Sequence, residues 1–257
     1  MILATWNINS IRARLERLLA WLASAQPDVV CLQEIKTTEA KFPTAELATA
    51  GYRCAVLGQP TYNGVAILAR GEIANVAAGL GEHLRDDQAR LLGADVLGVR
   101  VLNVYFPNGQ EVGSKAFEYK LQWMLALRQY LDARLRPEQP VLLCGDFNVA
   151  IDDLDVAHPM QWAASVLCCP PVRGALENIR AWGFTDIFRQ HNPEGHIYSW
   201  WDYRQLGFPR NDGLRLDHLL ASAPLASRCR WARVDREQRK GEKPSDHAPV
   251  MCEFADL

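Results

Sequence analysis

Val141-Leu-Leu-Cys-Gly-Asp-Phe-Asn148 runs from a continuous apolar stretch straight into an acid and an amide. An apolar run without alternation is typical of a strand that is covered on both faces of its sheet. A carboxylate or an amide beside such a strand is costly to remove from water unless it meets a cation or another polar group. The stretch therefore predicts a buried strand that ends at a polar site.

Short apolar runs bounded by polar turns recur along the whole chain and indicate further strands. The predicted strands lie at residues 3–6, 29–32, 54–57, 65–69, 99–104, 141–144, 216–221 and 250–254. Ser10 and Ser114 are candidate N-caps of two helices, over 11–25 and from Ser114 to about residue 135, in which apolar residues repeat with the helical period. A third helix is expected over 173–182 and ends at Gly183.

Many strands with interleaved helices predict a layered α/β fold, although the sequence alone does not fix the strand order. The chain contains no internal repeat, no linker rich in Gly and Ser, and no sharp shift in composition. We therefore expect one domain that spans residues 1–257.

Composition narrows the class of protein. The 257 residues include 28 Lys and Arg against 30 Asp and Glu, a net charge of −2, and the 49% hydrophobic content excludes a disordered chain. No apolar run approaches the roughly 20 residues of a membrane span, and the N-terminus lacks the features of a secretory signal. We therefore expect a cytoplasmic protein whose seven cysteines are reduced. The charge argues against nucleic-acid binding, since such proteins are expected to be basic.

Four further stretches place polar side chains at the ends of predicted strands. They are Trp6-Asn-Ile-Asn9, Leu32-Gln-Glu-Ile-Lys36, Arg215-Leu-Asp-His218 and Ser245-Asp-His-Ala-Pro249. Each one taken alone has a structural interpretation: an Asp after a strand commonly forms a turn, and Asn7 can cap the helix that follows. Glu34 alone fits a surface residue, and His247 alone fits a histidine packed in the core. Five such sites in one chain favour a shared chemical role.

These strand ends together supply oxygen ligands for a hard cation and an acid/base pair. The residues are Glu34, Asp146, Asp217 and Asp246 with Asn7, Asn148 and His247. A set rich in carboxylates and without a cysteine cluster favours Mg²⁺ or Mn²⁺ over zinc.

Seven ordered motifs between residue 2 and about residue 254 resemble those of the exonuclease III family of AP endonucleases, within the DNase I-like endonuclease/exonuclease/phosphatase superfamily. The motifs are Trp6-Asn7-Ile8-Asn9, Leu32-Gln33-Glu34, Tyr62-Asn63-Gly64-Val65-Ala66, Asn103-Val104-Tyr105-Phe106-Pro107, Gly145-Asp146-Phe147-Asn148, Gly213-Leu214-Arg215-Leu216-Asp217 and Ser245-Asp246-His247. The resemblance implies a four-layered α/β sandwich, in which two packed mixed β-sheets are flanked by helices.

The resemblance also implies roles at the metal and the attacking water. Glu34 matches the principal carboxylate ligand of the metal, Asn7 the amide beside it, and Asp246 a residue near the metal. Asp146 matches the residue that orients or deprotonates the water, and Asn148 the residue that holds the phosphate or that water.

Three further roles follow from the same resemblance. His247 matches the imidazole that contacts a non-bridging phosphate oxygen, with Asp217 as its carboxylate partner. Tyr105 matches an active-site phenol, whose role is either phosphate contact or proton transfer. Asn9 stands where some relatives have an aspartate, a difference that bears on one metal position.

The segment Tyr198-Ser-Trp-Trp-Asp-Tyr-Arg204 bears on the substrate, because an aromatic ring can stack on an unstacked sugar or base. One of the two tryptophans is expected to be a core residue. The resemblance places Trp200, Leu214 and Leu216 in a pocket for a flipped-out abasic sugar. Lys36, Asn108 and Lys115 are weaker candidates for backbone contacts, and seven basic residues between 228 and 243 are either a solvated face or the border of a DNA groove.

The sequence thus predicts a monomeric, Mg²⁺-dependent phosphodiesterase of DNA repair that acts on double-stranded DNA. It is expected to cut 5′ to abasic sites and to act on 3′ ends as phosphodiesterase, phosphatase and 3′→5′ exonuclease, in proportions left open. Residues 152–173 match the family poorly, in a region that shapes how DNA enters the cleft. The alternatives are a phosphatase of the same superfamily that acts on small phosphorylated molecules, and a DNA-binding relative without catalysis.

Overall fold

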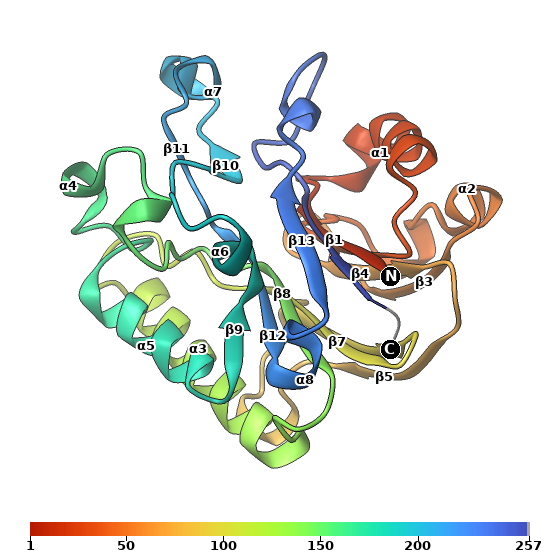
Figure 1. Ribbon diagram of the computed structural model, residues 1–257, viewed down its shortest axis with the longest axis horizontal. Coiled ribbons are helices and arrows are strands. Elements are labelled where there is room, and N and C mark those ends of the chain that lie inside the picture. The colour runs from red at the N-terminus through yellow and green to blue at the C-terminus, as the bar shows by residue number, and fades with distance from the viewer. Residues whose placement is uncertain (256–257) are drawn as a thin grey trace.

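Two six-stranded sheets lie face to face in the computed structural model, which describes residues 1–255 (Figure 1). The last two residues of the predicted domain, 256 and 257, lie outside the described part. The first sheet has the order β13 (Cys229–Val234), β14 (Val250–Phe254), β1 (Ile2–Asn7), β2 (Val29–Gln33), β4 (Val65–Ala69) and β3 (Arg53–Leu57). Strands β1 and β2 are parallel, whereas the other neighbouring pairs are antiparallel.

The second sheet repeats this plan. Its order is β5 (Ile73–Ala78), β6 (Leu91–Val96), β7 (Val99–Tyr105), β8 (Val141–Asp146), β12 (Asp217–Ser222) and β9 (Phe184–Asp186). Strands β7 and β8 are parallel and the other pairs antiparallel. A separate short ribbon pairs β10 (Trp200–Trp201) with β11 (Gly213–Leu214).

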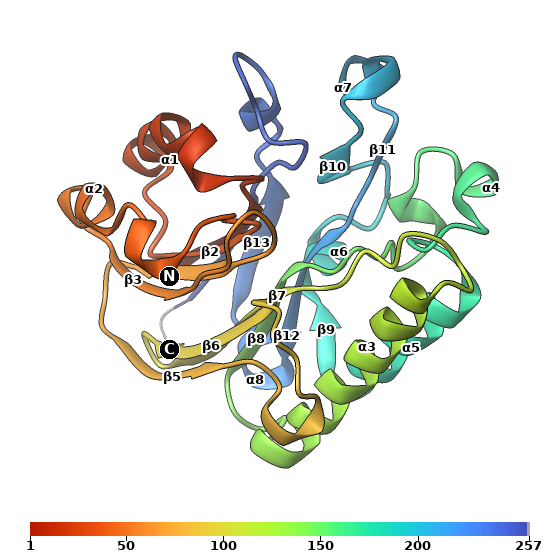
Figure 2. The same ribbon diagram turned by 180° about the vertical axis from the view of Figure 1, so that it is seen from behind.

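Helices cover the outer face of each sheet, as Figures 1 and 2 show. Helices α1 (Ile11–Ala25) and α2 (Thr44–Thr49) pack on the first sheet, and α3 (Lys115–Arg134) and α5 (Pro170–Arg180) pack on the second. A third apolar cluster fills the space between the two sheets, with residues such as Leu3 and Leu142 from opposite sides. The four-layered sandwich of two mixed sheets is confirmed.

The remaining helices are short. They are η1 (Glu39–Lys41), η2 (Gly81–His83), η3 (Asp153–Asp155), α4 (Pro159–Trp162), α6 (Ile187–His191), η4 (Arg204–Leu206), α7 (Gly207–Arg210), α8 (Ala223–Ala226) and η5 (Arg236–Arg239). Among residues 1–255, no helix has the length and apolar character needed to cross a bilayer.

A buried polar clamp joins the two sheets. Gln33 on β2 donates from its side-chain nitrogen to Asn103 Oδ1 on β7 at 2.7 Å, and Asn103 Nδ2 donates to the carbonyl oxygens of Leu32 and Ala66. Both side chains are fully buried. Because buried amides are costly unless paired, this clamp fixes how the sheets lie against each other one residue from Glu34.

The strand ends that carry polar residues meet at one edge of the sandwich. Parallel strands end at the same edge, so Asn7, Glu34, Tyr105 and Asp146 follow or end β1, β2, β7 and β8 there. Strand β12 runs antiparallel to β8 and opens at this edge, where Asp217 pairs with Asp146.

Some expected elements differ in the structure. Ser114 caps α3 as predicted, since its hydroxyl oxygen accepts from the Phe117 N–H at 3.2 Å. Ser10 makes no side-chain cap bond; instead its N–H donates to the Glu34 carbonyl oxygen at 2.7 Å. The expected helix over 173–182 begins at Pro170, because two prolines favour its first turn.

Candidate active site

Gly145 allows the closest backbone approach at this edge. Its φ is 147°, and a Cβ built there would lie 1.9 Å from the Val104 carbonyl oxygen on the neighbouring strand. A side chain at this position would therefore push β8 away from β7 and displace Asp146, the next residue.

Several residues around the site that are not glycine have a left-handed backbone conformation. Asn9, Glu34, Lys36, Asn63 and Asn148 have φ between 45° and 53°. Such conformations persist only where the surroundings fix them, and they cluster at sites of function. The loops after the strands are therefore held in set geometries.

Asn7 connects two of the predicted carboxylates. Its side-chain nitrogen donates to Glu34 Oε1 at 2.8 Å and to Asp146 Oδ2 at 2.9 Å, while its Oδ1 accepts from the Asn9 N–H at 3.0 Å. The Lys36 ammonium bonds Glu34 Oε2 at 2.8 Å. The side-chain amide of Asn7 thus links Glu34, which follows the first sheet's strand β2, to Asp146 on strand β8 of the second sheet.

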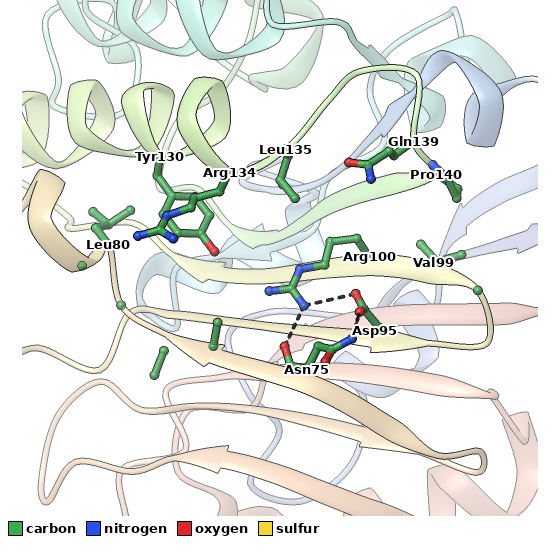
Figure 3. A pocket seen from close by; sticks show the side chains of 15 residues that line it. Asn75, Leu80, Asp95, Val99, Arg100, Tyr130, Arg134, Leu135, Gln139 and Pro140 are labelled. Carbon is green, nitrogen blue, oxygen red and sulfur yellow. Dashed lines mark hydrogen bonds and ion pairs between the residues drawn. The ribbon is translucent and has the colours of Figure 1, made fainter.

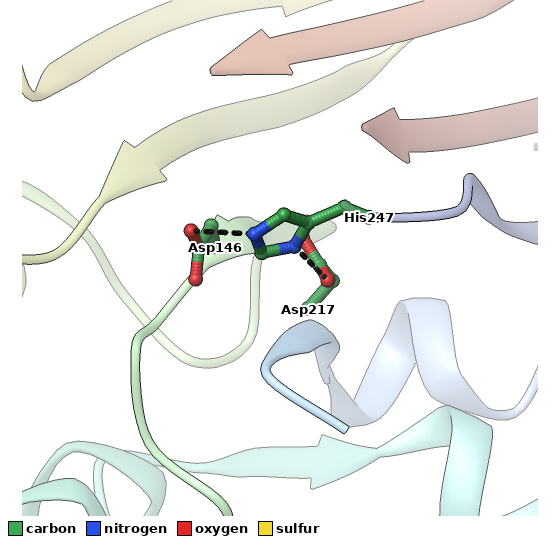
Figure 4. Close-up of side chains that lie close together, drawn as sticks. All are labelled: Asp146, Asp217 and His247. Carbon is green, nitrogen blue, oxygen red and sulfur yellow. Dashed lines mark hydrogen bonds and ion pairs between the residues drawn. The ribbon is translucent and has the colours of Figure 1, made fainter. Parts of the chain in front are cut away.

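His247 lies between two buried carboxylates, as Figure 4 shows. Its Nδ1 is 2.8 Å from Asp217 Oδ2, and its Nε2 is 3.7 Å from Asp146 Oδ2. The ligand atoms of these three residues all lie within 4.8 Å of one another, a spacing that suits a divalent metal ion.

The charges of this group follow from its burial and its neighbours. Burial alone would lower the pKa of His247, but the carboxylates of Asp217 and Asp146 outweigh it and raise this pKa to about 10. Burial raises the pKa of Asp146 to about 7, although His247 acts in the opposite direction. At neutral pH the imidazole is thus a cation, and its Nε2–H is a donor on the side that faces Asp146.

We expect Asp217→Asn to lower the pKa of His247, because it removes the nearer carboxylate. The pKa of His247 is raised on folding, so the pair stabilises the fold fully below about pH 6.5. That stabilisation is lost as the pH rises through about 10. An NMR titration of the ring, with unfolding measured at pH 6 and pH 10, tests this; an unchanged ring pKa in the variant would contradict it.

Tyr105 and Asp246 border the same group. Burial, with the carboxylates of Glu34 and Asp146, raises the pKa of Tyr105 well above its ordinary value, so the phenol keeps its proton. Burial would raise the pKa of Asp246, but His247 and hydrogen bonds from Trp200 and Asn9 hold it below the ordinary value.

The predicted amides lie beside Asp146. The Asn148 N–H donates to Asp146 Oδ1 at 2.9 Å, and Asn108 Nδ2 donates to Asn148 Oδ1 at 3.1 Å. Lys115 is exposed at the first position of α3. Asn108 therefore joins the cluster, whereas Lys115 lies at its outer border.

The aromatic segment also reaches this edge. Trp201 is 1% exposed and belongs to the core, whereas Trp200 is half-buried and donates from Nε1 to Asp246 Oδ2 at 3.0 Å. Trp200 pairs with Leu214 between β10 and β11, and Leu216 is buried two residues further on. The three residues of the predicted pocket thus lie together beside the carboxylates.

Comparison with known proteins places this arrangement in a family. The model of the endonuclease/exonuclease/phosphatase family matches residues 4–247. Exodeoxyribonuclease III of Haemophilus influenzae is 36% identical over 262 residues, which cover 97% of this chain and 98% of that protein. The chain belongs to the exonuclease III group of this family.

Solved structures agree with this membership. An AP endonuclease from Archaeoglobus fulgidus has a TM-score of 0.96 and 38% identity, and a 3′–5′ exonuclease from Neisseria meningitidis has 0.95 and 43%. A Neisseria 3′ phosphatase bound to a product DNA hairpin has 0.95 and 42%. Each match covers 99% of both chains.

Two arginines of the basic run over 228–243 make contacts within the fold. Arg239 is 6% exposed, donates to the Ser245 carbonyl oxygen at 2.7 Å and lies over the rings of Tyr203 and Phe208. Arg236 also lies over Phe208, at 4.7 Å. These two arginines fasten the loop around α7 to the loop before β14, whereas the other basic residues of the run are exposed.

A different set of cations lies next to the site. Arg12, Lys36 and Lys41 line a cavity of about 360 Å³, together with Ser10 and neighbouring residues. Lys36 also contacts Glu34, so one residue of this cavity lies directly beside the carboxylates.

A cavity of about 760 Å³ lies away from the site (Figure 3). It is lined at the starts of β7 and β8, by Val99, Arg100 and Pro140, whereas the site lies at the ends of these strands. Arg100 is paired there with Asp95 at 3.1 Å and with the Asn75 carbonyl oxygen at 2.8 Å. This cavity does not contain any of the predicted site residues.

Trp162 and Lys120 lie next to residues of the site, and this was not predicted from the sequence. The Trp162 ring lies edge-on to Trp200, with ring centroids 6.1 Å apart, and comes from the poorly matching segment 152–173. Lys120 interrupts the apolar face of α3 between Phe117 and Met124. A charge inside an apolar helical face was the signal for Lys120, whereas nothing in the sequence paired Trp162 with Trp200.

Proposed function

We propose that this protein hydrolyses phosphodiester bonds of damaged double-stranded DNA, by incision 5′ to abasic sites and by removal of nucleotides or blocking groups from 3′ ends. Its membership of the exonuclease III group supports this function. The observation that carries the mechanism is the place of Asp146, between the Asn7–Glu34 pair and the His247 imidazole.

Each side chain has a task that follows from its charge and partners. Asp146 takes the proton of the attacking water, because its burial makes it a stronger base than an exposed carboxylate. His247, held by Asp217, donates to a non-bridging oxygen of the phosphate as negative charge builds up there. Tyr105 and Asn148 supply further donors toward the same phosphate.

The residues present fit a divalent metal ion. Four carboxyl groups, of Glu34, Asp146, Asp217 and Asp246, face two cationic side chains, Lys36 and His247. Oxygen donors of this kind suit Mg²⁺, or Mn²⁺ in its place. We assign Glu34 as the main ligand, with Asn7 and Asp246 beside it. The ion supplies charge neutralisation at the phosphate and at the leaving 3′-oxygen.

Glu34→Gln is expected to raise the Mg²⁺ concentration for half-maximal rate about 10- to 100-fold, because the neutral amide is a weaker ligand. Chelation with EDTA should abolish turnover in both proteins. A Mg²⁺ titration of the incision rate measures the shift. Glu39→Gln, at an exposed position of η1, is the matched control. An unchanged Mg²⁺ requirement in Glu34→Gln would contradict the assignment.

The apolar side chains of Trp200, Leu214 and Leu216 suit a sugar without its base. Leu214 and Leu216 are buried beside the half-buried Trp200, so we expect selectivity to rest on size rather than on hydrogen bonds to a base. The cavity lined by Arg12, Lys36 and Lys41 gives the adjoining DNA backbone a cationic track, with Asn108 and Lys115 on the other side. We expect the protein to act as a monomer.

Two duplexes decide between this function and its alternatives. One carries an internal abasic analogue, the other a recessed 3′ end, and each is incubated with Mg²⁺ or with EDTA. Mg²⁺-dependent incision of the first or stepwise shortening of the second supports the proposal, and the ratio gives the balance of activities.

Inactivity on both duplexes would refute the proposal. Release of phosphate from inositol phosphates would then favour a phosphatase acting on small phosphorylated molecules. Binding of both duplexes without any turnover would favour the DNA-binding relative, although binding alone does not need Asp146, Asp217 and His247 together.

A further inference from the structure

Lys120 is a buried amine to which the mechanism above gives no task, and its burial lowers its pKa to about 7. It lies on the core-facing side of α3, with an exposed fraction of 0%. An ammonium group is costly to bury unless its donors are paired. Its partners therefore show what holds it there.

The three partners are backbone carbonyl oxygens from three separate loops. Lys120 Nζ donates to Asn108 at 3.1 Å, to Asn148 at 2.8 Å and to Val166 at 2.7 Å. These residues follow β7, β8 and α4. An ammonium carries three N–H donors, so each donor has one acceptor. One side chain thereby joins two loops of the site to the segment 152–173.

The contacts continue from Lys120 to the reacting group. Asn108 and Asn148 are hydrogen-bonded to each other, and the Asn148 N–H donates to Asp146 Oδ1 at 2.9 Å. Asn148 has a left-handed backbone, with φ of 49°, and needs support from its surroundings. The Lys120 stem also packs under Gly109, where an added Cβ would lie 3.0 Å from Lys120 Cδ.

We propose that Lys120 is a positioning residue for the hydrolysis: it holds the loops of Asn108 and Asn148 so that both amides and Asp146 face the phosphate together. The inference rests on the proposed function, because the phosphate is the substrate named there. Lys120 itself does not touch the reacting atoms.

Lys120→Met tests this, because it keeps the length of the side chain and removes all three donors. The matched control is Leu131→Ala, a buried change on the same helix away from the site. We expect kcat to fall about 10- to 100-fold in Lys120→Met, with KM within about threefold, since small misplacements of reacting groups cost this much. Leu131→Ala should lose thermal stability and keep kcat within about threefold.

Hydrogen exchange gives a readout that does not need activity. Amides over 108–110 and 147–150 should exchange faster in Lys120→Met and remain unchanged in Leu131→Ala. Lys120→Arg keeps a positive charge but places its donors in one plane. If the position of the donors matters and not the charge, kcat of Lys120→Arg should fall about tenfold.

Two results would overturn the inference: exchange in these segments that stays at the wild-type rate in Lys120→Met, or a loss of kcat no larger than that of Leu131→Ala. If Lys120→Met fails to fold, wild-type kcat and exchange in Lys120→Arg would overturn it. A wild-type protein inactive on both duplexes would refute the proposed function, while the exchange measurements would still decide whether Lys120 holds the loops.

Discussion

The Asp146→Asn enzyme should bind abasic duplex DNA and cleave it about 10²–10⁴-fold more slowly than the wild-type enzyme. The change keeps the shape of the side chain but removes its ability to accept a proton. Asn148 N–H can still donate to the oxygen of the new amide, so the loop has a reason to stay in place. Single-turnover incision with saturating enzyme measures the chemical step.

Binding must be measured separately from cleavage. Fluorescence anisotropy in EDTA gives the Kd of each variant without turnover, and we expect it to change by less than about threefold. Asp132→Asn removes an exposed carboxylate of α3, paired only with Arg128, and serves as the control. An Asp146→Asn enzyme with near-wild-type turnover would refute the role of Asp146 as base.

His247→Asn should lose about 10²–10³-fold in kcat, because the phosphate oxygens then lose the charged imidazolium donor. Asn can donate a hydrogen bond, but it cannot carry the charge that Asp217 and Asp146 stabilise on the imidazole. Burial of Asp217 without its partner should also lower thermal stability.

The pH dependence of kcat distinguishes the loss of activity in His247→Asn from the loss in Asp146→Asn. Wild-type kcat should fall toward alkaline pH as His247 loses its proton, and this fall should be missing in His247→Asn. The control is His83→Asn, in η2 near Tyr130 and Leu80, beside the cavity of about 760 Å³ that lies away from the site. A His247→Asn profile that keeps the wild-type alkaline fall would contradict the role of the imidazolium.

The pattern of acids at strand ends was sufficient to predict which polar side chains the structure brings together. Asn7, Glu34, Asp146, Asp217 and His247 come from five separate stretches, and the structure brings them together because parallel strands end at one edge. Continuous apolar runs marked these strands, since both faces of each sheet are covered.

Strands at the borders of the sheets were missed for a physical reason. Strand β5 is an edge strand of small residues that are half-buried or exposed, and β6 is interrupted by Gly93 and Asp95, so neither has a continuous apolar run. Strand β13 carries two arginines in six residues and is likewise an edge strand.

Net charge could not predict the partner. The value of −2 hides a separation of charge, with four carboxyl groups gathered at the site and Arg12, Lys36 and Lys41 beside them. Within the most basic stretch of sequence, Arg236 and Arg239 stack on aromatic rings. Only the fold shows which cations are free to face DNA.

Incision in ¹⁸O-labelled water tests the central claim directly, namely that a water positioned at Asp146 attacks phosphorus and breaks the bond to the 3′-oxygen. The abasic duplex is cut with Mg²⁺, and both fragments are analysed by mass spectrometry. We predict one ¹⁸O atom in the new 5′-phosphate and an unlabelled 3′-hydroxyl on the other fragment. An unlabelled 5′-phosphate, or a 3′ end that carries an unsaturated aldehyde from elimination, would contradict the account.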